Sequence, residues 1–121
     1  MIVALFRRRL KDGVTFEDFI AAWEADAGFS VPARVLNAVS VDDPCEILSV
    51  GFVDIDAATI ATATETVADQ EAVRHSRIEH LVESTILHAY YDLRTEHDFS
   101  GDPRAIDLAS PESLLAAMKD A

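Results

Sequence analysis

The sequence has little cysteine and little positive charge. Cys45 is the single cysteine among 121 residues, so the chain cannot form an internal disulfide and nothing in it indicates an oxidising compartment. Ten lysines and arginines stand against 22 aspartates and glutamates, which gives a net charge of −12. Because nucleic acids and anionic membrane surfaces attract positive charge, this balance argues against both as partners.

Long apolar runs and the common ligand motifs are also missing. No segment approaches the roughly 20 apolar residues of a membrane-spanning helix. The first residues, MIVALFRRRLK, place an apolar run before basic residues, which is the reverse of a secretory signal, so we expect a cytoplasmic protein. Without a His-x-His pair, a Cys-x-x-Cys pair or a glycine-rich phosphate loop, we expect neither a bound metal nor a cofactor.

Half of the residues are apolar, and their spacing predicts alternating strands and helices. In chain order these are a strand at Ile2–Leu10, a helix from a Thr15 cap to Gly28, strands at Ala33–Val41 and Glu46–Val53 around an Asp42-Asp43-Pro44 turn, a helix from an Asp56 cap, and a strand at Ser84–Thr95. This β-α-β-β-α-β order predicts an α+β, ferredoxin-like fold with a four-stranded antiparallel sheet and two helices on one face.

The two helices differ in how apolar their inner rows are. Thr15 and Asp18 form a capping box at the start of the first helix, whose apolar stripe we assign to the core. That stripe is Phe16, Phe19, Ile20, Trp23 and Ala27. The second helix has the inner row Ile60, Thr64, Val67, Glu71, His75, Ile78 and Val82. Ionisable residues interrupt this second row, and we expect a kink or break around Gln70–His75.

The last strand divides its side chains between two faces. We expect Leu87, Ala89, Tyr91 and Leu93 to pack under the helices. The opposite set, Ile86, His88, Tyr90, Asp92 and Arg94, should face away from them. A sheet with helices on one face leaves its other face open, and burial of that face against a second copy would explain a homodimer.

The chain divides at about residue 95. Residues 1–95 form the predicted domain, and residues 96–121 form a C-terminal extension. Within it, Glu96–Ala109 contains Gly101 and Pro103 and is typical of an irregular connection. Ser110 and Pro111 then begin a short helix.

Three segments resemble parts of a known family in the right order: MIVALFRRRLKDGVTFEDFIAAW, SVGFVDID and HSRIEHLVESTILHAYYD. They are similar to the opening, the third strand and the closing segment of stress-responsive dimeric α/β-barrel (Dabb-like) proteins, over roughly Met1 to Leu93. Antibiotic-biosynthesis-monooxygenase-like and EthD-like proteins share that architecture. The resemblance implies a homodimeric barrel, and its members include cofactor-independent monooxygenases and polyketide cyclases.

The resemblance also points to particular residues. His75 matches a histidine that acts as acid and base in a plant polyketide cyclase of this fold, and Asp92 stands at the family's separation from it. That cyclase also uses a histidine on its first strand, whereas this chain has Ala4 in that region and no histidine on the strand. Cyclase chemistry would therefore need a different second group here.

Our candidate catalytic residues are His75, His88 and Tyr90, and our candidate ligand-binding residues are Asn37, Arg7 and Asp92. His75 has glutamates four residues away on both sides, and His88 shares a strand face with Tyr90. Arg7 and Arg9 share one face of the first strand while Arg8 points to the other, so one arginine at a cavity mouth could grip an anion. The alternatives are a solvated helix pair for His75, hydrogen-bonded barrel lining without chemistry for His88 and Tyr90, and a strand end emerging into solvent for the arginines.

Two functions follow as hypotheses. The first is a monooxygenase- or cyclase-like enzyme that acts on an aromatic or polyketide-like molecule, with a histidine as general base and Tyr90 as hydrogen-bond donor. The second is a non-catalytic, stress-responsive homodimer that binds a small apolar ligand. A cavity between the helices and the sheet, or between two sheets, with converging histidine and tyrosine would favour the enzyme.

Overall fold

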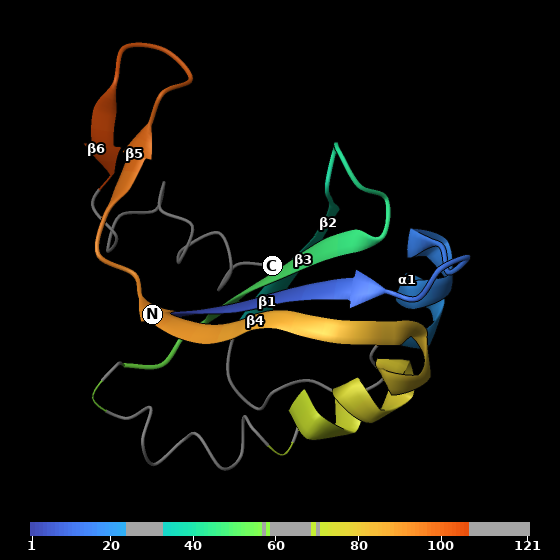
Figure 1. Cartoon of the computed structure of the whole chain (residues 1–121). Helices are drawn as coiled ribbons and strands as arrows, with labels where there is room; N and C mark the ends of the chain where they lie inside the picture. The colour runs from blue at the N-terminus through green and yellow to red at the C-terminus, as the bar shows by residue number, and fades with distance from the viewer. Residues whose placement is uncertain (24–32, 57, 59–68, 70, 107–121) are drawn as a thin grey trace.

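The computed structural model describes residues 1–23, 33–56, 58, 69 and 71–106. They form an α+β structure with a four-stranded antiparallel sheet and two helices, compatible with the predicted ferredoxin-like fold (Figure 1). The sheet order is β2-β3-β1-β4. The strands are β1 (Ile2–Leu10), β2 (Ala33–Val39), β3 (Glu46–Val53) and β4 (Val82–Asp92). The helices are α1 (Phe16–Trp23) and a helix of residues 71–78, which continues into the short 3₁₀ helix η2 (Glu79–Leu81).

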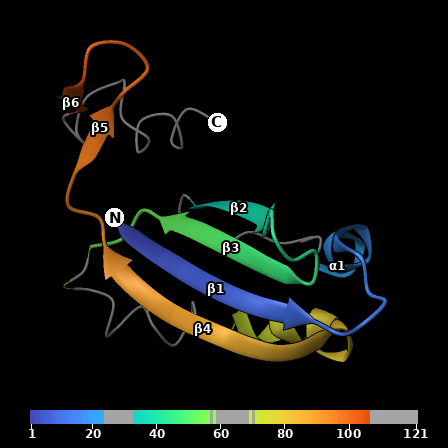
Figure 2. The same ribbon diagram turned by 45° about the horizontal axis from the view of Figure 1, so that its top comes forward.

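Strand β1 is the centre of the sheet, because it pairs with β3 on one side and β4 on the other. Its even-numbered residues face the helices, and Ile2, Ala4, Arg8 and Leu10 are buried there. Figure 2 shows the 71–78 helix beneath β1 and β4, and α1 beside the end of the sheet where β1 finishes. No helix or strand of the described residues covers the opposite face, which we call the open face. Strand alternation on β1 therefore decides which side chains lie between sheet and helices.

The predicted capping box at the start of α1 is confirmed. The Thr15 amide donates to Asp18 Oδ2 at 3.0 Å, and the Asp18 amide donates to Thr15 Oγ1 at 3.1 Å. The chain reaches this cap through Gly13, whose φ of 82° favours glycine. The cap orients α1 so that Phe19 enters the buried cluster at this end of the domain. That cluster consists of Leu10, Phe19, Ile47 and Ile78.

Several predicted boundaries differ from the structure. Strand β2 ends at Val39, before the turn, and β4 runs from Val82 to Asp92. Val82 therefore belongs to the strand and not to the helix row, because the 71–78 helix tightens into η2 and ends. From 71 to 78 the helix has no break. The Asp56-capped start of this helix, the end of the first helix at Gly28 and the helix predicted after Ser110 lie outside the described residues.

The predicted faces of the last strand are wrong. His88 and Tyr90 pair with Phe6 and Ala4 of β1, and all four face the helices. Leu87, Ala89 and Tyr91 pair with Arg7, Leu5 and Val3 and lie on the open face. Alternation assigns side chains to two sets but does not say which set is inside. We assigned the more apolar set to the helix side, whereas the open face is itself apolar.

Residues 96–106 are also more regular than predicted. They form a two-stranded hairpin of β5 (Glu96–Asp98) and β6 (Arg104–Ile106). Asp98 stabilises the turn, since its carboxylate accepts from the Ser100 amide at 2.8 Å and pairs with Arg104 at 3.4 Å. Figure 1 shows this hairpin standing clear of the sheet. No helix among the described residues is long and apolar enough to cross a membrane.

Candidate functional site

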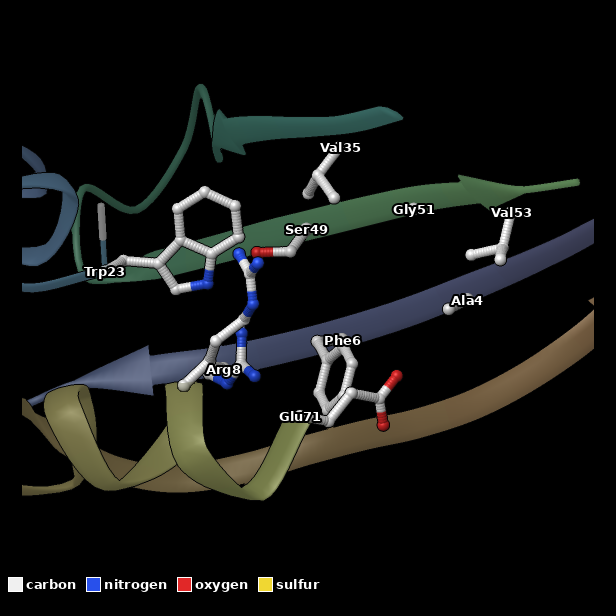
Figure 3. Close-up of a pocket in the computed structure, with 10 residues that line it drawn as sticks. Ala4, Phe6, Arg8, Trp23, Val35, Ser49, Gly51, Val53 and Glu71 are labelled. Carbon is white, nitrogen blue, oxygen red and sulfur yellow. The ribbon is translucent and has the colours of Figure 1, made fainter. Parts of the chain in front are cut away.

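A pocket lies between the helix-facing side of the sheet and the two helices (Figure 3). Its volume is about 50 Å³, room for roughly three to five water molecules at about 10–15 Å³ each. The described residues that line it come from three strands and both helices. They are Ala4, Phe6, Arg8, Trp23, Val35, Ser49, Gly51, Val53, Glu71 and Arg74.

Small residues open one end of this pocket. Ala4 and Gly51 are register partners on β1 and β3, and both face the helices. A Cβ atom placed on Gly51 would lie 3.7 Å from Ala4 Cβ and 3.8 Å from Val35 Cγ2, which is ordinary van der Waals contact. The missing side chain at Gly51 therefore leaves space that a methyl group could occupy without a clash.

The other end of the pocket is polar and centres on Arg8. This side chain is 4% exposed, and its Nη1 donates to Ser49 Oγ over a long 3.5 Å. Ser49 in turn donates to Asn37 Oδ1 at 2.6 Å. Burial lowers the pKa of Arg8 to about 10, against the opposing charge of Glu71, so the guanidinium is still positively charged at neutral pH.

A second polar cluster joins the 71–78 helix to β4. The Tyr90 hydroxyl donates to Glu71 Oε2 at 2.6 Å, and His88 Nε2 lies 3.2 Å from the same oxygen and 3.3 Å from the hydroxyl. Since the hydroxyl hydrogen is directed at Glu71, a hydrogen on Nε2 satisfies both of these contacts. Burial, then the bond to Glu71, raises the pKa of Tyr90 above its ordinary value, which keeps the phenol protonated.

Phe6 connects the two polar groups. The Arg8 guanidinium lies 4.2 Å from the centre of its ring, and the His88 ring stacks on it at 4.0 Å with an angle of 18°. Glu71 makes a second connection, because it both binds His88 with Tyr90 and lines the pocket. His88 and Tyr90 can therefore influence the position and the protonation of a carboxylate that lines the pocket.

Of the predicted catalytic residues, His88 and Tyr90 come together and His75 does not join them. His75 lies one helical turn after Glu71, is half-buried and is not among the described residues that line the pocket. We expected His88 and Tyr90 to face away from the helices, whereas they contact Glu71 on the helix side.

The three predicted ligand-binding residues lie in different places. Asn37 faces the helices and bonds Ser49 beside the pocket. Arg7 lies on the open face, where its Nη2 is 2.7 Å from Glu46 Oε1, so it does not reach this pocket. Asp92 lies at the end of β4 and pairs with Arg94 Nε at 3.1 Å.

Sequence reasoning missed Arg8 and Glu71 as site residues. Both carried a signal: each is a charge in an otherwise apolar row, Arg8 among Ala4, Phe6 and Leu10, and Glu71 on the inner row of its helix. A charge in such a row must find partners inside the fold. Which of the three consecutive arginines lies inside depends on which face of β1 the helices cover. The strand register of the structure shows this, whereas the sequence does not.

Comparison of the chain with protein-family models, with curated proteins and with solved structures gave no match. The site therefore has to be interpreted from its own geometry. Within the described ranges, no three His, Cys, Asp or Glu side chains group in a way that could hold a metal ion. The chemistry that these residues can perform themselves is proton transfer and the binding of a small charged or aromatic molecule.

The raised pKa of Tyr90 predicts a pH-dependent stability difference. Its ordinary pKa is 10.0 and the folded value is higher, so the phenol's contribution is complete below pH 10.0 and is lost as the pH rises towards the folded pKa. Urea unfolding of the wild type and of Tyr90→Phe should therefore differ more at about pH 8 than at about pH 11. Tyr91→Phe, a change of the half-exposed neighbour, is the control. A Tyr90 difference that stays constant with pH would contradict the half-buried, Glu71-bonded phenol.

Proposed function

We propose that the chain is a small cofactor-independent enzyme that carries out acid–base chemistry on a carbonyl compound bound in the pocket. The observation that carries the proposal is the position of Glu71, which lines the pocket and is held by His88 and Tyr90. A carboxylate fixed by two hydrogen-bonding neighbours suits the removal of a proton from carbon next to a carbonyl group. Glu71 is the proposed base, and His88 and Tyr90 are positioning residues.

The walls of the pocket support an aromatic or polyketide-like ligand. Phe6 and Trp23 supply aromatic surface, and Ala4, Val35 and Val53 supply aliphatic surface. With a volume of about 50 Å³, such a lining can take one end of a larger aromatic or polyketide-like molecule, while a few polar groups orient it. This agrees with the monooxygenase- and cyclase-like activities that the resemblance implies, with Glu71 in the position of the base in place of a histidine.

We also propose that the chain works as a homodimer in which the open sheet faces pack together. Leu36, Leu48, Leu87 and Tyr91 on this face are each more than a third exposed. Two of its arginines are paired with acidic residues within the chain: Arg7 with Glu46 at 2.7 Å, and Arg9 with Asp43 at 2.6 Å and Glu83 at 3.2 Å. A second copy therefore meets an apolar face with paired charges, in spite of the net charge of −12.

Hydrogen exchange on a model carbonyl compound tests the proposed chemistry. In deuterated buffer, the protein should accelerate deuterium uptake at the acidic carbon of acetylacetone, followed by proton NMR, because Glu71 removes the proton and solvent returns a deuteron. Glu71→Gln should slow the catalysed exchange by about 10²–10⁴-fold. Glu79→Gln, an exposed change just after the same helix, should leave it unchanged. Exchange that is no faster with the wild type than without protein would favour a binding protein without catalysis.

Sedimentation equilibrium tests the dimer. Two chains of 13.2 kDa should give about 26 kDa at micromolar concentration. Leu48→Asp places a charge on the open face of β3 and should shift the mass to that of one chain, with an unchanged circular dichroism spectrum. Phe99→Asp adds the same charge to the exposed hairpin and should leave the dimer intact. A folded wild-type monomer would contradict the packing of two sheets.

A further inference from the structure

The buried arginine at the polar end of the pocket identifies the chemical class of the ligand. We propose that Arg8 binds a carboxylate, and that the pocket takes a small carboxylate with a short apolar tail. This rests on the proposed function, since it names the ligand class of the same pocket. Arg8 itself takes no part in the proton transfer assigned to Glu71.

The first observation is a hydrogen-bond donor of Arg8 that has no acceptor. The side chain is 4% exposed, and within the described part of the chain its Nε has no hydrogen-bond partner. The bond from Nη1 to Ser49 is long, at 3.5 Å. A buried donor left unsatisfied is costly, and the edge of a guanidinium matches the two oxygens of a carboxylate. A ligand carboxylate in the pocket would supply acceptors to the terminal nitrogens of this poorly satisfied guanidinium.

The second observation is the local charge. Although the whole chain carries −12, the guanidinium of Arg8 places a buried positive charge on the pocket wall. Arg74 lies 5.7 Å from the centre of the Trp23 ring. Glu71 is directed through Oε2 at His88 and Tyr90, which leaves Arg8 as the buried cation at the polar end.

The third observation is the division of the pocket into a polar and an apolar end. Figure 3 shows Arg8 and Ser49 at one end and Ala4, Gly51 and Val53 at the other. A carboxylate at Arg8 would therefore extend its tail towards Gly51. The volume of about 50 Å³ limits that tail to a few carbon atoms, and a longer or aromatic tail has to project through the mouth. Butyrate is a suitable probe.

The test compares butyrate with butyramide, which has the same shape and no charge. Trp23 lines the pocket and is the only tryptophan, so its fluorescence reports binding directly. We expect butyrate to bind at least tenfold more tightly than butyramide. Arg8→Gln should abolish that preference, whereas Arg94→Gln, which removes the same charge from an 82% exposed side chain, should keep it. Equal binding of the two probes, or no binding of either, would overturn the proposal.

A second variant decides the matter if Arg8→Gln does not fold. Gly51→Ala keeps Arg8 and adds only ordinary contacts, but it occupies the apolar end. This variant should weaken the binding of butyrate at least tenfold and leave the binding of formate, which has no tail, unchanged. Equal weakening of both anions, or of neither, would contradict the proposed orientation.

The two proposals can fail separately. Glu71→Gln should lose the acetylacetone exchange and retain butyrate binding, since the carboxylate of Glu71 is not the group that holds the anion. Butyrate binding without exchange would leave a carboxylate-binding protein. Exchange without any preference for butyrate over butyramide would support the enzymatic proposal and contradict the binding of a carboxylate by Arg8.

Discussion

The hydrogen bond from Tyr90 to Glu71 joins the two parts of the molecule that form the pocket. Tyr90 belongs to β4, an edge strand of the sheet, and Glu71 to the helix that leads into that strand. At 2.6 Å, with His88 3.2 Å from the same carboxylate, the contact fixes where the 71–78 helix lies over the sheet. A hydrogen bond to a carboxylate is stronger than one between neutral groups, so this contact contributes more to stability than a neutral hydrogen bond would.

Strand alternation on β1 places its three arginines on two different faces of the sheet. Arg7 and Arg9 lie on the open face, where each is paired with an acidic residue from a neighbouring segment. Arg8 lies between sheet and helices, where burial lowers its pKa to about 10 and Phe6 covers one side of the guanidinium. A shift of one residue along β1 would exchange these positions. The register with β3 and β4 therefore determines both the presence of Arg8 at the pocket and the pairing of Arg7 and Arg9 on the open face.

Local patterns in the sequence predict much of the sheet. The alternation in Ile2–Leu10, the capping box of Thr15 and Asp18 and the span Glu46–Val53 all depend on neighbouring residues, and the structure confirms them. The face of β4 could not be predicted in this way. Alternation does not show which of the two sets of side chains lies inside, and the register that does show it comes from pairing with β1, which is distant in sequence.

The site was only partly predictable for the same reason. His88 and Tyr90 are two residues apart on one strand, so their proximity follows from strand geometry. Their contact with Glu71 depends on where the helix lies, and the burial of Arg8 depends on which face the helices cover. The hairpin of β5 and β6 was missed because three-residue strands are too short to show a period.

A double-mutant cycle between Glu71 and Tyr90 tests this account most directly. The free energy of unfolding would be measured for the wild type, Glu71→Ala, Tyr90→Phe and the double variant. If the hydrogen bond holds the helix to the sheet, the two losses should be coupled by about 1–2 kcal/mol, because either change alone already removes the contact. Losses that add to within about 0.5 kcal/mol would show that the two residues do not interact. The pocket would then lack the fixed carboxylate on which its proposed chemistry depends.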